Sequence, residues 1–518
     1  MRTLQEIERE RQHEQSRLDL FMGLAERNRT GQFATPHALA LEIAEYAWGL
    51  WKDRREKVRF LEPCVGTGVF YAALMHQFPA DRIETALGYE IDHGHAEVAR
   101  SLWRRKGLRV RQGDFTQQEP PRRRFNLLIT NPPYVRHHHL ETADKDRLQS
   151  AVLGEFGIRI SGLAGLYCYF LLSCHRWMEE GGLSVWLVPS EFMDVNYGSA
   201  VKHYLLERVT LLHIHRYCPS EVQFDEALVS SAVVVFERRL PPDGHTVRFS
   251  FGGSLLRPAH EAAVPLRSLQ AKDKWTRYPA TGARSSNGKA VRHTLGDLFT
   301  IKRGLATGDN AFFILRRSEA LDLGIPAAFL RPILPAPRFL SETVIEPDAD
   351  GYPRLEPQLA LIDCDLPESE LRRRFPDFWC YLESGMQRNV HAGYLASRRS
   401  PWYSQEARPA PPFLCTYMGR ANNGRKPFRF LWNQSQATAH NVYLLLYPKG
   451  ALKEALDVNP SLYAEVYAAL RRIDTNGFMG EGRVYGGGLY KMEPKELAQM
   501  PADIPLRVMR DAIPMPVT

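Results

Sequence analysis

Residues 60–70 read FLEPCVGTGVF, and this stretch predicts the fold of the first half of the chain. The end of an apolar strand is followed by an acidic residue, a turn with glycines at 66 and 68, and the start of an apolar helix. Glycine lets the backbone approach a ligand closely, because no side chain blocks it. A G-x-G pair alone is more often a tight turn, and the missing Lys-Ser/Thr pair argues against a phosphate-binding loop.

Segments typical of strands and of helices alternate around this turn. The strand-like runs are VRFL (58–61), TALGYEI (85–91), LRVRQ (108–112) and FNLLIT (125–130). Such alternation predicts an α/β fold with a parallel sheet and helices on both faces. Residues 166–182 are expected to form a helix closed by glycines, followed by the strand LSVWLV (183–188), and residues 227–238 are expected to hold a late hairpin strand.

The pattern breaks at RRLPPDGHT (238–246), where prolines, Asp and Gly predict a domain boundary. We therefore expect a helical extension over 1–29, an α/β domain over 30–240 and a second domain over 241–518. The second domain is rich in Pro, Gly and aromatic residues and is expected to be mixed α/β.

Composition excludes several classes of protein. The 518 residues, 44% of them hydrophobic, can fill the cores of two domains. The sequence holds neither an apolar run of membrane-spanning length nor a signal peptide, so we expect a cytoplasmic protein. The 7 cysteines are scattered without a C-x-x-C pair, which favours neither a disulfide framework nor a zinc site.

Charge divides unevenly along the chain. Residues 1–240 hold 31 Lys and Arg against 31 Asp and Glu, whereas residues 241–518 hold 36 against 28. A neutral first half and a basic second half suggest a catalytic unit joined to one that meets a polyanion such as nucleic acid. A solvated surface explains the same excess equally well.

Acidic side chains follow two of the predicted strands. Glu90 ends the second strand, 22 residues after Gly68, at the distance where a carboxylate accepts hydrogen bonds from ribose hydroxyls. Asp114 follows the third strand and can accept from an adenine amino group, while Phe115 can pack on its ring. Each acid alone is more often a strand-end cap, but together at one sheet edge they predict a nucleoside pocket.

The fourth strand ends in ITNPPYV (129–135). The prolines hold the backbone extended and donate no hydrogen bond, so the Asn131 side-chain oxygen and the Pro132 carbonyl form an all-acceptor site. Two acceptors that hold the hydrogens of an exocyclic amine favour its pyramidal, nucleophilic form. Tyr134 offers a face on which a base can stack. A mere strand-terminating loop is the alternative.

The chain resembles the gamma-class adenine-N6 DNA methyltransferases of type II restriction-modification systems. The segments GQFATP (31–36), EPCVGTGVF, GYE, GDF and NPPY follow one another in the order of that class. The resemblance implies a Rossmann-like sheet for S-adenosylmethionine with a late antiparallel hairpin, then a DNA-recognition domain. It also implies cofactor contacts from Thr35, Pro36, Glu62, Pro63, Gly66, Gly68, Glu90, Asp114 and Phe115, and target-base contacts from Asn131, Pro132, Pro133 and Tyr134.

The loosely matching segment EVQFDEALVSSAVVVF places a second base-stacking aromatic at Phe224. The amine of a paired adenine is buried in the duplex, so the enzyme would flip the nucleotide out and transfer the methyl group directly, without a covalent intermediate. No metal is expected. The resemblance further implies double-stranded DNA as partner, a monomer associated with the nucleoid, and a separately encoded cognate endonuclease.

Basic and aromatic residues interleave in the second half. Arg and Asn read base edges, and Lys and Arg neutralise phosphates, although an Arg run on a solvated helix looks the same. The candidate DNA contacts are Arg303, Arg398, Arg399, Arg420, Asn422, Asn423, Arg425 and Lys426.

Two other functions stay open at this point. Similar NPPY loops occur in enzymes that methylate guanine-N2 in ribosomal RNA or a protein glutamine, because each presents a planar amine. The chain could also be the DNA-specificity subunit of a larger defence complex. The long basic second half argues against the first alternative, and the complete set of pocket residues argues against the second.

Overall fold

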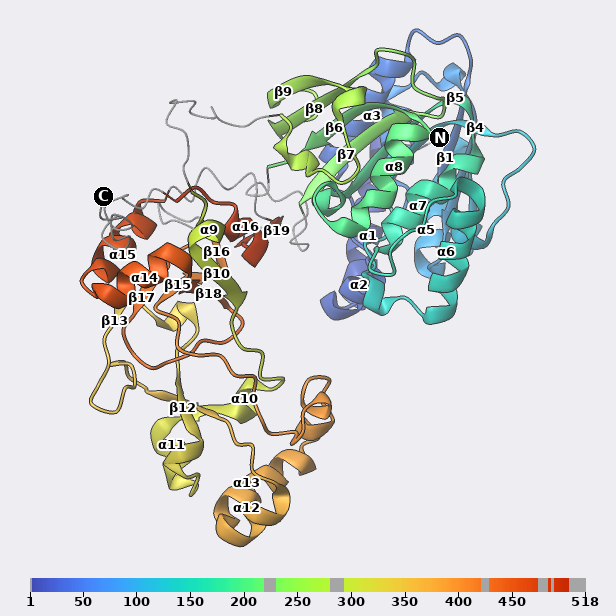
Figure 1. Ribbon diagram of the computed structural model, residues 1–518. Coiled ribbons are helices and arrows are strands. Elements are labelled where there is room, and N and C mark those ends of the chain that lie inside the picture. Colours follow the sequence, from blue (N-terminus) through green and yellow to red (C-terminus); the bar gives the residue numbers. More distant parts are fainter. Residues whose placement is uncertain are drawn as a thin grey trace, which may run out of the picture. The chain divides into compact units, whose positions relative to one another are not determined.

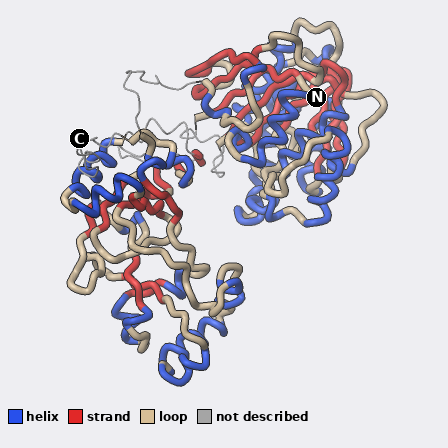
Figure 2. Tube along the Cα trace, in the orientation of Figure 1, coloured by secondary structure: helices blue, strands red, loops and turns tan. Residues whose placement is uncertain are grey.

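The computed structural model describes residues 2–218, 230–279, 293–420, 428–473, 483–485 and 489–502. The chain divides into two compact units, one of residues up to Arg284 with Val484–Gly488, the other of Ser285–Arg483 with Leu489–Thr518 (Figure 1). Figure 2 shows that strands of the first unit gather in one sheet covered by helices, whereas the second unit contains more loop. Within the described residues, no helix is both long and apolar enough to cross a membrane.

In the first unit, strands and helices alternate over residues 58–112, and strands predominate among the described elements after residue 210. The helices are α1 (Leu4–Phe21), α2 (Leu24–Thr30), α3 (His37–Trp51), α4 (Val69–Gln77), α5 (His93–Trp103), α6 (Thr142–Phe156), α7 (Leu166–Ser173) and α8 (Ser199–Glu207). The strands are β1 (Val58–Glu62), β2 (Ile83–Glu90), β3 (Leu108–Gln112), β4 (Phe125–Thr130), β5 (Met178–Pro189), β6 (Thr210–Arg216), β7 (Ser231–Glu237), β8 (Thr246–Gly253) and β9 (Pro258–Pro265).

These strands form one sheet in the order β3-β2-β1-β4-β5-β7-β6-β8-β9. Neighbours among β1 to β5 run parallel, while β7 runs antiparallel to both β5 and β6. The predicted α/β fold with a late antiparallel hairpin is therefore confirmed. The sheet also continues past residue 240, because β8 pairs with β6 and β9 with β8, and the first unit extends to Arg284.

One predicted element differs from the structure. Residues 166–182 do not form a single helix, since α7 ends at Ser173 and β5 begins at Met178. Phe125 of β4 pairs with Met178, but Leu127 pairs with Leu183, so β5 has extra residues at this point. Gly181, with φ +76°, lies in that irregularity. The two glycines thus bend a strand rather than close a helix.

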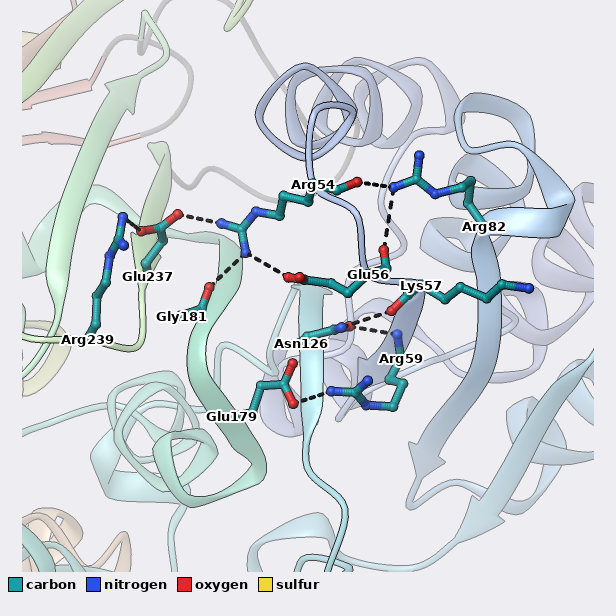
Figure 3. A network of polar contacts seen from close by, with 10 residues as sticks. All are labelled: Arg54, Glu56, Lys57, Arg59, Arg82, Asn126, Glu179, Gly181, Glu237 and Arg239. Carbon is teal, nitrogen blue, oxygen red and sulfur yellow. Dashed lines mark hydrogen bonds and ion pairs between the residues drawn. The ribbon is translucent and has the colours of Figure 1, made fainter.

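A polar network lies at the amino ends of the central strands (Figure 3). Asn126 of β4 accepts a hydrogen bond from the Arg59 N–H at 2.6 Å and donates to the Lys57 carbonyl at 2.9 Å. Arg54 donates to the Gly181 carbonyl at 2.8 Å. These bonds satisfy buried polar groups, and they join β1 to β4 and the segment before β1 to β5. The opposite, carboxyl edge of the parallel strands faces the cavity described below.

The second unit is mixed α/β, as predicted. The helices after residue 293 are α9 (Leu295–Leu298), α10 (Asn310–Phe313), α11 (Arg317–Asp322), α12 (Glu368–Arg374), α13 (Pro376–Gln387), α14 (Gly450–Val458), α15 (Leu462–Arg472) and α16 (Pro494–Ala498). The strands are β10 (Phe299–Arg303), β11 (Ile314–Arg316), β12 (Leu330–Ile333), β13 (Val344–Ile345), β14 (Leu359–Ile362), β15 (Phe413–Thr416), β16 (Met418–Arg420), β17 (Phe430–Asn433), β18 (Tyr443–Pro448) and β20 (Leu489–Lys491). The short strand β19 (Arg483–Tyr485) begins with the last residue of this unit before Val484–Gly488.

Its largest described sheet, β10-β18-β15-β17-β13, has an apolar cluster on each face. Phe413 and Cys415 of β15 pack in one cluster, with α14 and α15, whereas Leu414 packs in the other. Side chains of a strand alternate between the two faces, so this continuous apolar run is buried on both sides. A separate cluster surrounds the small sheet β11-β14-β12 and helices α10 to α13.

Candidate active site

A cavity of about 370 Å³ opens at the carboxyl edge of the first unit's sheet. The ends of β1, β2, β3 and β4 meet there, as expected for the carboxyl ends of neighbouring parallel strands. The predicted residues that line the cavity are Pro63, Gly66, Glu90, Asp114, Phe115, Asn131, Pro132, Pro133 and Tyr134. Thr35, Pro36, Glu62 and Gly68 lie outside the cavity lining.

Asn131 presents a buried acceptor at the end of β4. Its Nδ2 donates to Thr35 Oγ1 at 3.0 Å and to the Phe33 carbonyl at 3.4 Å. The carbonyl can only accept, so this contact orients the amide with Oδ1 on the other side. Among the described residues, no group donates a hydrogen bond to Oδ1, although it is buried. A ligand that brings an N–H would satisfy this acceptor.

Hydrogen bonds hold the NPPY loop in place, one of them to Gly31 of the GQFATP segment. The Tyr134 N–H donates to the Gly31 carbonyl at 3.0 Å, and the Tyr134 hydroxyl donates to the Leu187 carbonyl at 3.3 Å. Gly31 has φ +65°, and a Cβ there would lie 2.5 Å from the Tyr134 nitrogen. Only glycine therefore permits this close approach. Burial raises the pKa of the Tyr134 phenol above its ordinary value, so it stays a neutral donor.

The two glycines of the turn after β1 meet different needs. Gly66 has φ +52° and donates its N–H to Glu90 Oε2 at 2.9 Å. No heavy atom of the described residues lies within 4 Å of the Cβ that another residue would add at Gly66, which lines the cavity. At Gly68 (φ +92°) a Cβ would lie 2.4 Å from Trp103 Nε1, which donates to the Thr67 carbonyl at 2.9 Å. Gly68 thus serves the packing of α5, and Gly66 faces the cavity.

The acidic residues accept hydrogen bonds from their own loops. Glu90 accepts from the N–H groups of Gly66 and Asp92, each at 2.9 Å, and burial raises its pKa above the ordinary value. Asp114 Oδ1 accepts from the N–H and hydroxyl of Thr116 at 2.8 and 2.7 Å. These bonds fix both carboxylates in place. Each Glu90 oxygen keeps a second lone pair for a ligand, whereas Asp114 keeps one on Oδ2, which accepts from Gln117 Nε2 at 2.9 Å.

Phe115 and Glu62 flank the acids. Phe115 is buried, with its ring 4.6 Å from that of Trp177 and stacked at 5.9 Å on Phe170. Glu62 is buried at the end of β1, and its Oε2 has no hydrogen-bond partner in the described part of the chain. Burial, and then the nearby charge of Glu90, raise the pKa of Glu62 well above its ordinary value.

Comparison with known proteins assigns the family. The model for the Eco57I restriction-modification methylase matches residues 89–224, and that for the C-terminal domain of the type II methyltransferase M.Eco57I matches residues 272–512. The type II methyltransferase M.XamI of Xanthomonas campestris pv. amaranthicola is 29% identical over 452 residues, which cover 85% of this chain and 80% of M.XamI. M.AccI of Acinetobacter calcoaceticus is 23% identical over 495 residues, 92% of this chain and 86% of M.AccI. The chain belongs to the type II restriction-modification methyltransferases.

Solved structures show the same fold. The type IIL enzyme MmeI, in complex with DNA, has a TM-score of 0.54 at 12% identity, and the match covers 90% of this methyltransferase and 65% of the MmeI chain. The DrdV–DNA complex has a TM-score of 0.52 at 14% identity, covering 94% and 57%. The methyltransferase thus spans less than two thirds of either chain, and at these identities the likeness concerns the fold.

Several cavity residues of the methyltransferase were not predicted. Ile91, directly after Glu90, is 64% exposed although it is apolar, and it lines the cavity. Phe33 lies in GQFATP, with its ring 6.5 Å from that of Tyr134. Phe33 lies inside the GQFATP motif and Ile91 directly follows the GYE motif, so these motifs could have indicated both residues. Gln15 and Asp19 of α1 also line the cavity, and the polar sequence of that helix gave no such indication.

The candidate DNA contacts of the second unit occupy different surroundings. Arg303 is exposed, with its guanidinium 4.2 Å from the centre of the Tyr417 ring. Arg398 stacks at 3.6 Å on Tyr394, which is 73% exposed. Arg399 instead donates to the carbonyls of residues 306 and 307 at 2.7 and 2.8 Å. The Arg420 side chain, Asn422, Asn423, Arg425 and Lys426 lie outside the described residues, as does Phe224.

The His137–His139 run forms a short 3-10 turn beside the cavity. Only His139 of the three lines it. Across the residues that the structure describes, no cluster of three or more His, Cys, Asp or Glu side chains is arranged to bind a metal ion.

Proposed function

We propose that this methyltransferase transfers a methyl group from S-adenosylmethionine to N6 of an adenine flipped out of duplex DNA. The buried, unpartnered Oδ1 of Asn131 carries the proposal. It stands at the wall of the cavity that also holds Glu90 and Asp114. An exocyclic amine is the group that would satisfy this acceptor, and the Pro132 carbonyl beside it would take the second amine hydrogen.

The cavity residues fit S-adenosylmethionine. Glu90 is held by two backbone N–H groups with lone pairs left for ribose hydroxyls, and Asp114 would accept from the adenine amino group. The exposed Ile91 would cover an apolar face of the adenine. Open space at Gly66 favours the methionine end. Glu62 lies outside the cavity lining, but its Oε2, which has no partner among the described residues, would accept from the same end. When bound, the cofactor supplies an electrophilic methyl group on its sulfonium sulfur.

The proposed roles of the remaining residues follow from these positions. Thr35 would orient the Asn131 amide through the 3.0 Å bond, with Pro36 following it at the start of α3. Tyr134 would stack on the flipped base and offset part of the cost of flipping, which is a few kcal/mol. Phe33, beside the Tyr134 ring, adds apolar surface to the same wall. Pro133 keeps the loop extended.

We further propose that the second unit recognises the DNA sequence. The exposed Arg303 and Arg398, and the 29 Lys and Arg against 25 Asp and Glu over residues 285–518, support contact with a polyanion. The structures of MmeI and DrdV, which share the fold, both hold DNA. We also propose that the protein acts as a monomer in the nucleoid and that a separately encoded cognate endonuclease exists.

Transfer of labelled methyl groups to unmethylated genomic DNA tests the function. N6-methyladenine mapped to one short sequence is the expected product. We expect Asn131→Ala to lower kcat by about 100-fold or more, because removing one preorganised polar group from a transition state costs that much. Asn196→Ala, which changes an exposed asparagine outside the cavity, serves as control and should keep wild-type activity.

Two results would contradict the proposal. Wild-type protein that binds S-adenosylmethionine yet methylates ribosomal RNA or a protein glutamine, and not DNA, would move the substrate to another planar amine. Full activity of Asn131→Ala on DNA would remove the role assigned to the NPPY loop.

A further inference from the structure

The helix α1 has a polar sequence, LQEIERERQHEQSRLDLF, that is typical of a solvated helix. Nevertheless two of its charged residues are buried, since Glu8 is 8% exposed and Arg11 4% exposed. Burying an ion pair costs desolvation energy and is weak evidence for a stabilising role. The buried charges on α1 therefore need another explanation.

The inward polar residues of α1 form one stripe. Glu8, Arg11, Gln15 and Asp19 follow one another at intervals of three or four residues, so they share one face of the helix. The last two of them line the cavity. The stripe thus runs from a buried ion pair to the wall of the candidate active site.

A continuous chain of hydrogen bonds follows this stripe. Arg11 donates to both carboxylate oxygens of Glu8 at 2.8 and 2.7 Å, and to Thr67 Oγ1 at 3.1 Å. The Thr67 hydroxyl donates to Gln15 Oε1 at 2.8 Å, and Gln15 Nε2 donates to Asp19 Oδ1 at 3.0 Å. From Arg11 through Thr67 and Gln15 to Asp19 every donor points the same way, so these bonds polarise one another. Thr67 lies between the two glycines of the turn.

The Glu8–Arg11 ion pair also lies beside the segment that follows GQFATP. Glu8 Oε1 lies 3.0 Å from His37 Nδ1, and His37 directly follows the GQFATP segment at the start of α3. The ion pair therefore contacts two segments beside the cavity: Glu8 lies next to His37, directly after the GQFATP segment, and Arg11 donates to Thr67 in the turn after β1.

We propose that the α1 stripe of Glu8, Arg11, Gln15 and Asp19 is a positioning element of the cofactor site. It holds the Gly66–Gly68 turn in place relative to residues 31–37 and supplies Gln15 and Asp19 to the cavity wall. The proposal rests on the proposed use of S-adenosylmethionine. It predicts that losing the stripe weakens cofactor binding far more than it weakens the fold.

A double substitution separates these two effects. Glu8→Leu/Arg11→Met removes both charges and keeps side chains of similar volume, so the buried pair is replaced without leaving one charge unpaired. Glu14 and Arg17 form a matched pair on the solvent side of the same helix, with Arg17 Nε 2.9 Å from Glu14 Oε2. Glu14→Leu/Arg17→Met is therefore the control.

Titration calorimetry with S-adenosylmethionine and thermal unfolding without it provide the two measurements. We expect Glu8→Leu/Arg11→Met to raise the cofactor Kd by about tenfold or more, as lost hydrogen bonds to charged groups imply, with a nearly unchanged unfolding midpoint. The control should match wild type in both. Wild-type affinity in Glu8→Leu/Arg11→Met would overturn the inference.

Gln15→Leu resolves the case in which the double variant is less stable as well as weaker in binding. This change breaks the hydrogen-bond chain at a half-buried residue without adding or removing a charge. Weaker binding at an unchanged midpoint supports the positioning role, and unchanged binding overturns it. Wild-type protein that fails to bind S-adenosylmethionine would instead refute the proposed function.

Discussion

Arg398 and Arg399 show how neighbouring residues of one type acquire different tasks. Arg398 lies on an exposed tyrosine ring, where its guanidinium can reach a phosphate or a base edge. Arg399 donates to the main-chain carbonyls of Ala306 and Thr307, and Thr307 is buried. The same sequence pattern, SRRSPWY, therefore holds one candidate DNA contact and one residue that secures a loop.

Substitution of each arginine distinguishes the two tasks. Arg398→Ala should weaken DNA binding and lower the salt dependence of log Kd by about one phosphate contact, with an unchanged unfolding midpoint. Arg399→Ala should cost about 1–3 kcal/mol of stability, because two carbonyls lose their partner. Fluorescence anisotropy at several salt concentrations and thermal unfolding measure the two effects. A stable Arg399→Ala with a reduced salt dependence would reverse the assignment.

The turn between β1 and α4 also contains two residues of one type that have different tasks. It combines two glycines in left-handed conformation, but only Gly66 faces the cavity, whereas Gly68 faces the indole of Trp103. A G-x-G spacing predicts the turn correctly. Which glycine approaches a ligand depends on α5, a helix that begins 25 residues later.

Alanine at each glycine tests this division. Gly68→Ala should lower stability by about 1–3 kcal/mol through overpacking against Trp103, in addition to backbone strain. Gly66→Ala meets no protein atom and carries only the strain of about 1 kcal/mol, but its methyl group enters the cavity. We expect a larger fall of the unfolding midpoint in Gly68→Ala and a larger loss of S-adenosylmethionine affinity in Gly66→Ala. Equal effects on both measurements would contradict this.

For the whole molecule, two buried histidines of β6, an interior strand of the sheet, make the stability depend on pH. His213 donates or accepts at Tyr46 Oη (2.8 Å) and Ser250 Oγ (2.7 Å), and His215 contacts the same serine at 2.8 Å. Burial first, then the charge of Arg248, lowers the pKa of His213 to about 3 and that of His215 to about 4. Both imidazoles are therefore neutral in the folded protein at physiological pH.

The sign of the effect follows from the unfolded chain, where histidine takes up a proton near its ordinary pKa of 6.5. The contribution of neutral His213 to the free energy of unfolding is present above pH 6.5 and is lost as the pH falls toward 3. Between pH 6.5 and about pH 5 the loss amounts to about 2 kcal/mol. His213→Gln should be less stable than wild type at about pH 7.5, and the difference in unfolding free energy should shrink by that amount at pH 5. Denaturant unfolding at both pH values measures it, and a constant difference would refute the assignment.

The sequence alone determined the α/β fold and the residues at the carboxyl ends of the first four strands. This succeeded because strand periodicity is local, and because the ends of neighbouring parallel strands must meet at one edge of a sheet. Glu90, Asp114 and Asn131 were found in this way. The continuation of the sheet into β8 and β9 was not, since β8 joins the sheet through β6, where His213 pairs with Arg248 more than 30 residues later, and β9 joins through β8.

Only the tertiary structure decided which polar residues turn inward. The α1 stripe and Arg399 look like solvated charges in the sequence, because a single helix or loop carries no record of what packs against it. Their burial depends on Thr67, His37 and the carbonyls of residues 306 and 307, all distant along the chain. The free Oδ1 of Asn131 likewise depends on Phe33 and Thr35, which orient its amide from almost 100 residues away.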